Sequence, residues 1–313
     1  MQSLLGFLRR GRTWVIGLPF VWLLVFFALP FLILLRISLT DMGGGENPFT
    51  PLYGYVNGSL QLLLHYENYR SIFSDGSGWA KTLYLEGYST SLRYALLTTV
   101  FCLVLGYPFA YFIALSRERF RTPLLMMVML PFWTSLLLRV YAWKGILADG
   151  GVLNRGLMAL GVISSPIHMI YTDIAMLIAM TYIYLPFMVL PLYANLVKMD
   201  PRLLEAAHDL GASPWRAFWL ITVPLSKAGI VAGCTLVFIP ALGEFIIPSL
   251  LGGAENVMIG RVVWDEMFAA NNWPRAAALA VVMIVMILIP LSVYHRYSSA
   301  AESAGADASG AQS

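Results

Sequence analysis

Long apolar stretches without Asp, Glu, Lys or Arg alternate with short polar stretches along this chain of 313 residues. A helix needs about 20 apolar residues to cross the hydrocarbon core of a bilayer, and lipid offers no partner to unpaired backbone groups, so such stretches form helices. The pattern predicts an all-α integral membrane protein with six transmembrane helices, at residues 13–35, 94–116, 122–138, 174–197, 228–251 and 276–294. One carboxylate, Glu244, interrupts the fifth stretch.

The polar stretches divide the chain into segments. Lys and Arg are about twice as dense in the connections that we place inside the cell as in those outside, and basic connections stay in the cytoplasm. The tail is rich in Ala, Ser and Gly, which is typical of disorder. We expect a cytoplasmic N-terminus at 1–13, a first transmembrane helix at 14–36, an external loop at 37–92, a five-helix core at 93–294 with a cytoplasmic loop at 198–227, and a disordered cytoplasmic tail at 295–313.

The composition narrows the class of protein further. Charged residues make up 12% of the chain, against about 25% in soluble domains. The net charge of +3 is too small to supply a phosphate-binding surface. An ordinary soluble enzyme, a disordered chain and a nucleic-acid-binding module are therefore excluded, and membrane lipid is the expected surrounding.

The cytoplasmic loop at 198–227 carries start and stop signals for two short helices. Asp200 before Pro201 is an N-cap followed by proline at the first helical position, and Gly211 can end that helix in a left-handed conformation. Ser213 before Pro214 repeats the start signal. These residues predict a compact helical hairpin, and by themselves they fit a hairpin that lies on the membrane without a partner equally well.

The same loop also contains a longer pattern: E-A-A, three residues, Gly, nine residues, Ile, one residue, an apolar residue and Pro. The residues that form it are Glu205, Ala206, Ala207, Gly211, Ile221, Val223 and Pro224. This pattern resembles the cytoplasmic loop signature of permease subunits of bacterial ABC importers, in which Leu is usual at the position of Val223. The resemblance implies that the hairpin is a coupling helix that docks into a groove on a cytoplasmic ATPase subunit.

Three further stretches, 130–135, 139–143 and 237–248, look like the putrescine/spermidine branch of these permeases. The resemblance implies a type I ABC importer permease fold in the bacterial inner membrane, with an N-terminal helix that packs on a second permease subunit. It also implies two copies of an ATPase subunit, which bind ATP and Mg, and a periplasmic polyamine-binding protein. A permease for another small solute is the alternative.

Sequence features needed for catalysis are missing from the chain. There is no Walker A sequence, no H-E-x-x-H and no G-x-S-x-G. An intramembrane protease would need a Ser–His pair or two aspartates within the predicted spans, and the spans have neither. We expect a transport subunit that is not an enzyme and holds no metal or cofactor of its own.

Glu244 is the first candidate for a cation path, because burying one carboxylate in a span costs about 2.5–3.5 kcal/mol. Pro248 has no N–H, so the Glu244 carbonyl loses its helical donor. A carboxylate and a free carbonyl at a broken helix suit a cation. The alternative is that Glu244 pairs with Arg139 or Arg261 and holds the bundle together.

Aromatic rings also attract an ammonium group. The aromatic candidates for the path are Trp133, Tyr141, Trp143, Tyr182 and Tyr184. Each of them fits the interfacial belt of a membrane protein as well. Asp173, just outside the fourth predicted span, would either guide cations inward or cap its helix.

Overall fold

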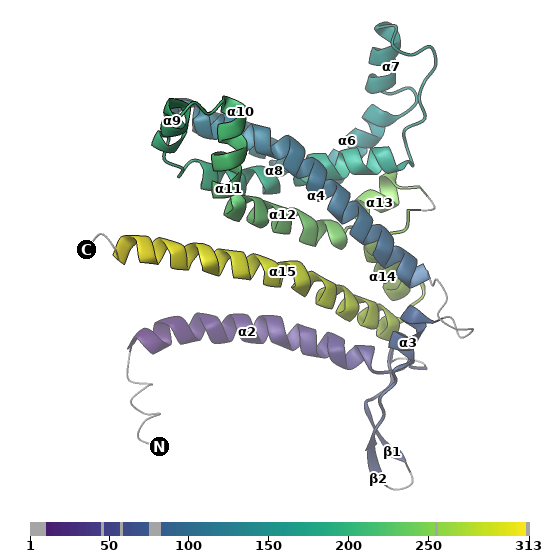
Figure 1. Ribbon diagram of the computed structural model, residues 1–313. Coiled ribbons are helices and arrows are strands. Elements are labelled where there is room, and N and C mark those ends of the chain that lie inside the picture. Colours follow the sequence, from purple (N-terminus) through teal and green to yellow (C-terminus); the bar gives the residue numbers. More distant parts are fainter. Residues whose placement is uncertain (1–10, 45–46, 57–58, 75–82, 254–255, 311–313) are drawn as a thin grey trace. The chain divides into compact units, whose positions relative to one another are not determined.

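The computed structural model describes residues 11–44, 47–56, 59–74, 83–253 and 256–310, and is helical except for one hairpin (Figure 1). It divides into two compact units, one formed by residues 1–82 and 263–283 and the other by residues 83–262 and 284–313. Most of the expected N-terminal segment 1–13 lies outside the described residues.

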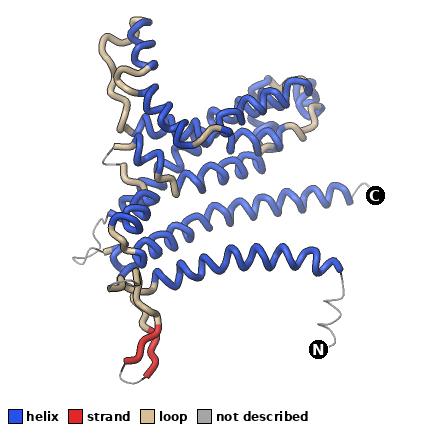
Figure 2. Tube along the Cα trace, turned by 180° about the vertical axis from the view of Figure 1, so that it is seen from behind, coloured by secondary structure: helices blue, strands red, loops and turns tan. Residues whose placement is uncertain are grey.

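The first unit opens with α2 (Gly11–Ser38), a helix whose apolar side chains face outward all round. The strands β1 (Tyr53–Val56) and β2 (Ser59–Leu62) pair antiparallel and are drawn red in Figure 2. The short helix α3 (Glu67–Phe73) follows. The Asn68 side chain donates hydrogen bonds to the carbonyls of Ser38 and Thr40, 3.2 and 2.7 Å away, and so ties α3 to the end of α2.

The second unit is built on three helices that pack against one another, α4 (Leu83–Leu115), α8 (Asp173–Leu196) and α12 (Lys227–Leu242). α4 begins well before the expected residue 94, so the expected loop 37–92 is shorter than predicted. Close approach of α8 and α12 depends on two glycines on one face of α12: a Cβ at Gly233 would lie 2.7 Å from Met188 Sδ, and one at Gly229 would lie 2.8 Å from Asn195 Cβ.

The third predicted span, 122–138, is wrong as a single helix. α5 (Glu118–Met129) continues into a 3-10 turn, η1 (Leu130–Trp133), and a new helix, α6 (Leu136–Leu147), leaves at 90°. Pro131 lacks the N–H that an α-helix would use, and Thr134 has an extended backbone (φ −89°, ψ 155°). The chain then forms α7 (Val152–Ala159).

The fifth predicted span, 228–251, is also broken. α12 ends at Leu242, and α13 (Ile246–Leu251) begins after a gap that contains Glu244. Pro248 cannot supply the backbone N–H that would continue α12 through this point. α14 (Ile259–Trp264) and a π-helical turn, η3 (Asp265–Ala269), lead into the last helix.

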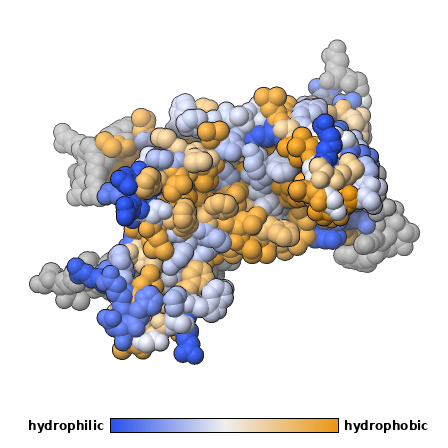
Figure 3. All heavy atoms as spheres, turned by 90° about the horizontal axis from the view of Figure 1, so that it is seen from above, coloured by the Kyte–Doolittle hydropathy of each residue, from blue (hydrophilic) through white to orange (hydrophobic). Residues whose placement is uncertain are grey.

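That last helix, α15, runs from Trp273 to Gly310. The expectation of disorder from residue 295 is therefore wrong over the described part of the tail, where repeated alanines, the best helix formers, favour the helix. Four described helices are long and apolar enough to span a membrane. Up to six spans result if two bent pairs each count as one, Glu118–Trp133 with Leu136–Ala159 and Pro214–Leu225 with Lys227–Leu242. Apolar side chains cover much of the face in Figure 3, as a bilayer requires.

Candidate functional site

The loop at 198–227 forms a knob of short helices at one end of the three-helix bundle (Figure 1): α9 (Arg202–Asp209), α10 (Pro214–Ala217), the π-helical turn η2 (Phe218–Thr222) and α11 (Val223–Leu225). The predicted caps are in place. Asp200 Oδ1 accepts a hydrogen bond from the Arg202 N–H at 3.0 Å, and Ser213 Oγ accepts one from the Arg216 N–H at 3.4 Å.

Gly211 closes α9 in the left-handed conformation that the sequence predicts, with φ +81°. The Ala212 N–H donates to the Ala207 carbonyl and the Gly211 N–H to the His208 carbonyl, both at 2.9 Å. This is the hydrogen-bond pattern of a Schellman motif, which satisfies the last carbonyls of the helix and reverses the chain. The turn therefore fixes the direction in which α10 leaves α9.

The residues of the predicted signature differ in their solvent exposure on the knob. Glu205 and Ala206 are exposed on α9, whereas Ala207 is buried beneath them. Leu210 is 89% exposed at the end of the same helix. A carboxylate beside small and apolar exposed side chains suits contact with another protein. Ile221 and Pro224 lie further on, in η2 and α11, where they belong to the connection into α12.

Glu244 lies in the gap between α12 and α13 and is 8% exposed. Its Oε1 accepts hydrogen bonds from the backbone N–H groups of Phe245, Ile246 and Ile247 at 3.1, 3.0 and 3.4 Å, and its Oε2 accepts one from the Tyr184 hydroxyl at 2.5 Å. All four contacts are donors, which is what an ionised carboxylate takes. The side chain thus holds the start of α13 and joins it to α8.

A row of aromatic rings connects this gap to the other helix break. The Tyr184 ring centroid lies 6.3 Å from that of Phe187 on α8, and Phe187 lies 5.4 Å, edge to face, from Phe132 in η1. The Arg139 guanidinium lies over the Phe132 ring, 5.7 Å from its centroid. The sequence analysis did not name Phe132 or Phe187 as candidates for the path, although Phe132 lies in the stretch 130–135 that resembles the putrescine/spermidine branch.

The other aromatic candidates lie elsewhere. Trp143 and Tyr182 contact each other with ring centroids 5.3 Å apart, and both line a cavity of about 410 Å³ among α4, α6 and α8. Its walls are apolar, so the rings are the main feature that it offers to a cation. Trp133 and Tyr141 are exposed on η1 and α6.

Asp173 stands in the first turn of α8, where Thr172 is the N-cap and accepts a hydrogen bond from the Ala175 N–H. The Asp173 carboxylate accepts a hydrogen bond from Asn256 Nδ2 at 2.5 Å and lies 3.8 Å from Arg93 on α4. The carboxylate therefore links α4, α8 and the segment before α14.

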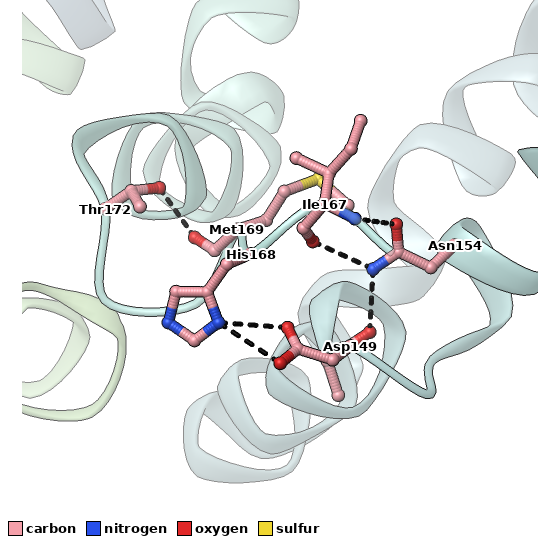
Figure 4. A network of polar contacts seen from close by, with 7 residues as sticks. Asp149, Asn154, Ile167, His168, Met169 and Thr172 are labelled. Atoms are coloured by element: carbon pink, nitrogen blue, oxygen red, sulfur yellow. Dashed lines mark hydrogen bonds and ion pairs between the residues drawn. The ribbon is translucent and has the colours of Figure 1, made fainter. Parts of the chain in front are cut away.

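A polar network orders the connection between α6 and α8 (Figure 4). The buried Asn154 side chain donates to the carbonyls of Ala148 and Ile167, at 3.2 and 2.9 Å, and accepts from the Ile167 N–H at 2.9 Å. His168 Nδ1 lies 3.0 Å from an Asp149 oxygen. The network holds α7 as an ordered arm, and no sequence motif pointed to it.

Comparisons with known proteins agree with this architecture. The spermidine/putrescine transport system permease protein PotB of Haemophilus influenzae is 37% identical over 281 residues, which cover 90% of this chain and 92% of that protein. The protein of the same name from Escherichia coli is 45% identical over 216 residues, which cover 69% of this chain and 78% of that protein.

Solved structures resemble this fold too. A chain of a bacterial alginate ABC transporter, in complex with an alginate pentasaccharide-bound periplasmic protein, has a TM-score of 0.66 at 16% identity and covers 92% of this chain and 94% of its own length. A chain of the MetNI methionine ABC transporter has a TM-score of 0.53 at 16% identity and covers 72% of this chain and 98% of its own length. The all-helical permease fold is confirmed.

A family model described as "Binding-protein-dependent transport system inner membrane component" matches residues 4–300. This match covers the knob, both helix breaks and the bundle between them. The resemblance to importer permeases is thereby confirmed, together with the multi-pass inner-membrane location. The chain belongs to the family of binding-protein-dependent transport system inner membrane components.

Proposed function

We propose that this chain is one of two permease subunits of an ATP-driven importer of polyamines such as putrescine and spermidine. The relatives named as spermidine/putrescine permeases support the cargo. The observation that carries the proposal is the knob, in which a Schellman turn at Gly211 presents the exposed Glu205 and Ala206. The knob is the surface on which a cytoplasmic ATPase subunit docks.

The assembly then consists of this chain, a second permease subunit, two copies of the ATPase, which hold ATP and Mg, and a periplasmic polyamine-binding protein. The broken segment from α5 to α6 counts as one span and α12 with α13 as another, so the chain crosses the membrane six times with both termini in the cytoplasm. ATP hydrolysis takes place in the partner, and this chain provides half of the path.

The two helix breaks support the position of the path. α12 has 16 residues, which at about 1.5 Å each place its end roughly 24 Å from its cytoplasmic start. α5 and η1, with 12 and 4 residues, reach roughly 26 Å. Both breaks thus lie at similar depth within a core about 30 Å thick, where irregular backbone must be covered by protein or line a water-filled cavity.

The groups between these breaks suit a cationic cargo. Glu244 supplies a negative charge, and Tyr184, Phe187 and Phe132 supply ring faces along one row. Arg139 over Phe132 is an internal example of a cation packed on this row. A diamine or triamine would pass along the row by exchanging one of these contacts for the next.

Docking is tested in vesicles that contain the complete importer. Glu205→Ala or Gly211→Asp should abolish uptake while the chain still inserts into the membrane, because the knob loses its carboxylate or its turn. The amount of ATPase that remains with the purified membrane subunits measures docking directly. Undiminished uptake and an unchanged amount of bound ATPase would defeat this assignment.

The cargo path is tested with Glu244→Gln, which keeps the shape and an acceptor oxygen but removes the charge. Uptake of radiolabelled putrescine and spermidine should fall, while ATP hydrolysis changes little. Glu118→Gln, the same substitution at an exposed position at the start of α5, is the matched control. Uptake kinetics of Glu244→Gln equal to those of the unaltered importer would show that Glu244 only holds the helix break.

A further inference from the structure

The part of the knob that leads into α12 has an irregular backbone. α10, η2 and α11 form one continuous helical piece in which η2 is a π-helical turn, and the Val223 N–H donates to the Phe218 carbonyl five residues earlier. This piece meets α12 at Ser226 with a bend of 67°. π-helical turns concentrate at functional sites because they leave the regular hydrogen-bond pattern of the helix.

Phe218, the first residue of this turn, is wedged against α4. Its ring centroid lies 5.5 Å from that of Tyr107 and 5.7 Å from that of Tyr111, with interplanar angles of 85° and 80°. Tyr107 and Tyr111 are one helical turn apart, so their rings form two walls around one insertion point. Edge-to-face contacts of this kind depend on ring orientation as well as on apolar area.

The Phe218 ring also contacts two other aromatic rings of the knob. Trp215 on α10 stacks on it with centroids 6.0 Å apart, and Trp219 meets it edge to face at 5.3 Å. Phe218 therefore contacts aromatic rings of the knob and of α4 at once. A displacement of the knob moves this ring against α4.

The bend at Ser226 is held to α4 by a hydrogen bond. The Ser226 hydroxyl donates to the Val223 carbonyl at 3.1 Å, and so the Tyr107 hydroxyl, 2.8 Å away, donates to Ser226 Oγ. Tyr107 thus contacts both Phe218 and the start of α12. In the described part of the chain, the buried Thr222 hydroxyl in the π-helical turn has no hydrogen-bond partner, so this turn is the least satisfied point of the connection.

We infer that Phe218 is a positioning residue that transmits movement of the knob to α4 and α12 through the walls formed by Tyr107 and Tyr111. This inference rests on the proposed docking of an ATPase at the knob. Phe218 itself takes no part in the docking of the ATPase. Removing its ring separates ATP hydrolysis from transport, whereas removing Glu205 prevents both.

The test uses the complete importer in vesicles and measures ATP hydrolysis and polyamine uptake in the same preparation. Phe218→Leu keeps an apolar side chain and removes the ring. In this variant the ATPase should stay bound and active, but the number of polyamine molecules taken up per ATP hydrolysed should fall. The expected decrease is about fivefold or more, which is the usual size of the coupling between two sites. Phe218→Tyr should restore the ratio. Phe109→Leu, the same substitution at a 51% exposed position of α4, is the control and should leave the ratio unchanged.

Tyr111→Leu removes one of the two rings on α4 that contact Phe218 and leaves the knob unchanged, so it should lower uptake per ATP in the same way. This variant replaces Phe218→Leu as the test if Phe218→Leu does not assemble into the importer. An unchanged ratio in Phe218→Leu, or in Tyr111→Leu when the former does not assemble, overturns the inference. Failure of the proposed function has a different signature: Glu205→Ala then retains its bound ATPase, its hydrolysis and its uptake.

Discussion

Replacing Tyr184 by Phe tests whether Glu244 is held as the structure has it. The substitution removes one hydroxyl, which donates to Glu244 Oε2 at 2.5 Å between side chains that are both buried. A hydrogen bond to a charged group contributes about 1.5–3 kcal/mol, so Tyr184→Phe should lower the free energy of unfolding by that amount. Glu244→Ala should cost more, roughly 3 kcal/mol or above, because the N–H groups of Phe245, Ile246 and Ile247 lose their acceptor as well.

The assay is thermal unfolding of the purified membrane subunits in detergent, followed with a thiol-reactive dye. Cys102 is fully buried in α4 and becomes reactive only when the bundle opens. Tyr182→Phe is the matched control, since the Tyr182 ring packs on Trp143 at a more exposed position, and should change stability by about 0.5 kcal/mol or less.

A double-mutant cycle between Tyr184→Phe and Glu244→Gln isolates the contact. A Tyr184→Phe cost no larger than that of Tyr182→Phe, with additive effects in the cycle, would refute the assignment of this hydrogen bond.

Three further predictions probe other parts of the fold. Gly233→Leu should destabilise the bundle by about 1–3 kcal/mol through overpacking against Met188, whereas Gly145→Ala, in open space on α6, should not; equal melting temperatures would contradict the close approach of α8 and α12. Gly211→Val should cost about 1–2 kcal/mol from its left-handed backbone and reduce ATPase binding, and Gly211→Asn should retain more of both; equal binding by the two variants would argue against the Schellman turn. Asn154→Ala should speed hydrogen exchange at the Ile167 amide, which loses its acceptor; exchange at the unaltered rate would mean that Asn154 does not order the arm.

The knob was predictable from the sequence because its signals are local. Asp200, Ser213 and Gly211 each act on backbone groups within a few residues of their own position, and the structure places all three as expected. The family signature added the kind of partner. It did not indicate the π-helical turn, since nothing in the residues from Phe218 to Thr222 distinguishes a π turn from an α turn.

Hydropathy alone does not reveal the two helix breaks, because it reports side chains and not backbone direction. Residues 122–138 and 228–251 stay apolar through both breaks, while the chain turns at Thr134 and again beside Glu244. The broken helix at Glu244 was expected from Pro248, whereas the break after Pro131 was missed, since proline is tolerated within transmembrane helices. The helical end of α15 was not predicted because its overall composition is typical of disorder. Its alanines nevertheless favour a helix.

The partner of Glu244 was beyond sequence reasoning. Tyr184 was a candidate for the path because of its aromatic ring, and nothing in the sequence linked it to Glu244. The two residues are 60 positions apart on different helices, and the packing of α8 beside α12 brings them together. Gly229 and Gly233, by contrast, stand four residues apart in an apolar stretch, a spacing typical of tight helix contacts that the sequence did offer.

The hydrogen bonds of Glu244 also bear on how the protein is made. Inserting a carboxylate without hydrogen-bond donors into the bilayer costs free energy. The donors of Glu244 are synthesised shortly before and directly after it. Tyr184 is synthesised 60 residues earlier, about 3–12 s ahead at 5–20 residues per second, so its hydroxyl is already part of the growing chain when Glu244 is made. The three backbone donors follow within the next three residues. The order of the helices along the chain therefore gives Glu244 one donor before it and three directly after it.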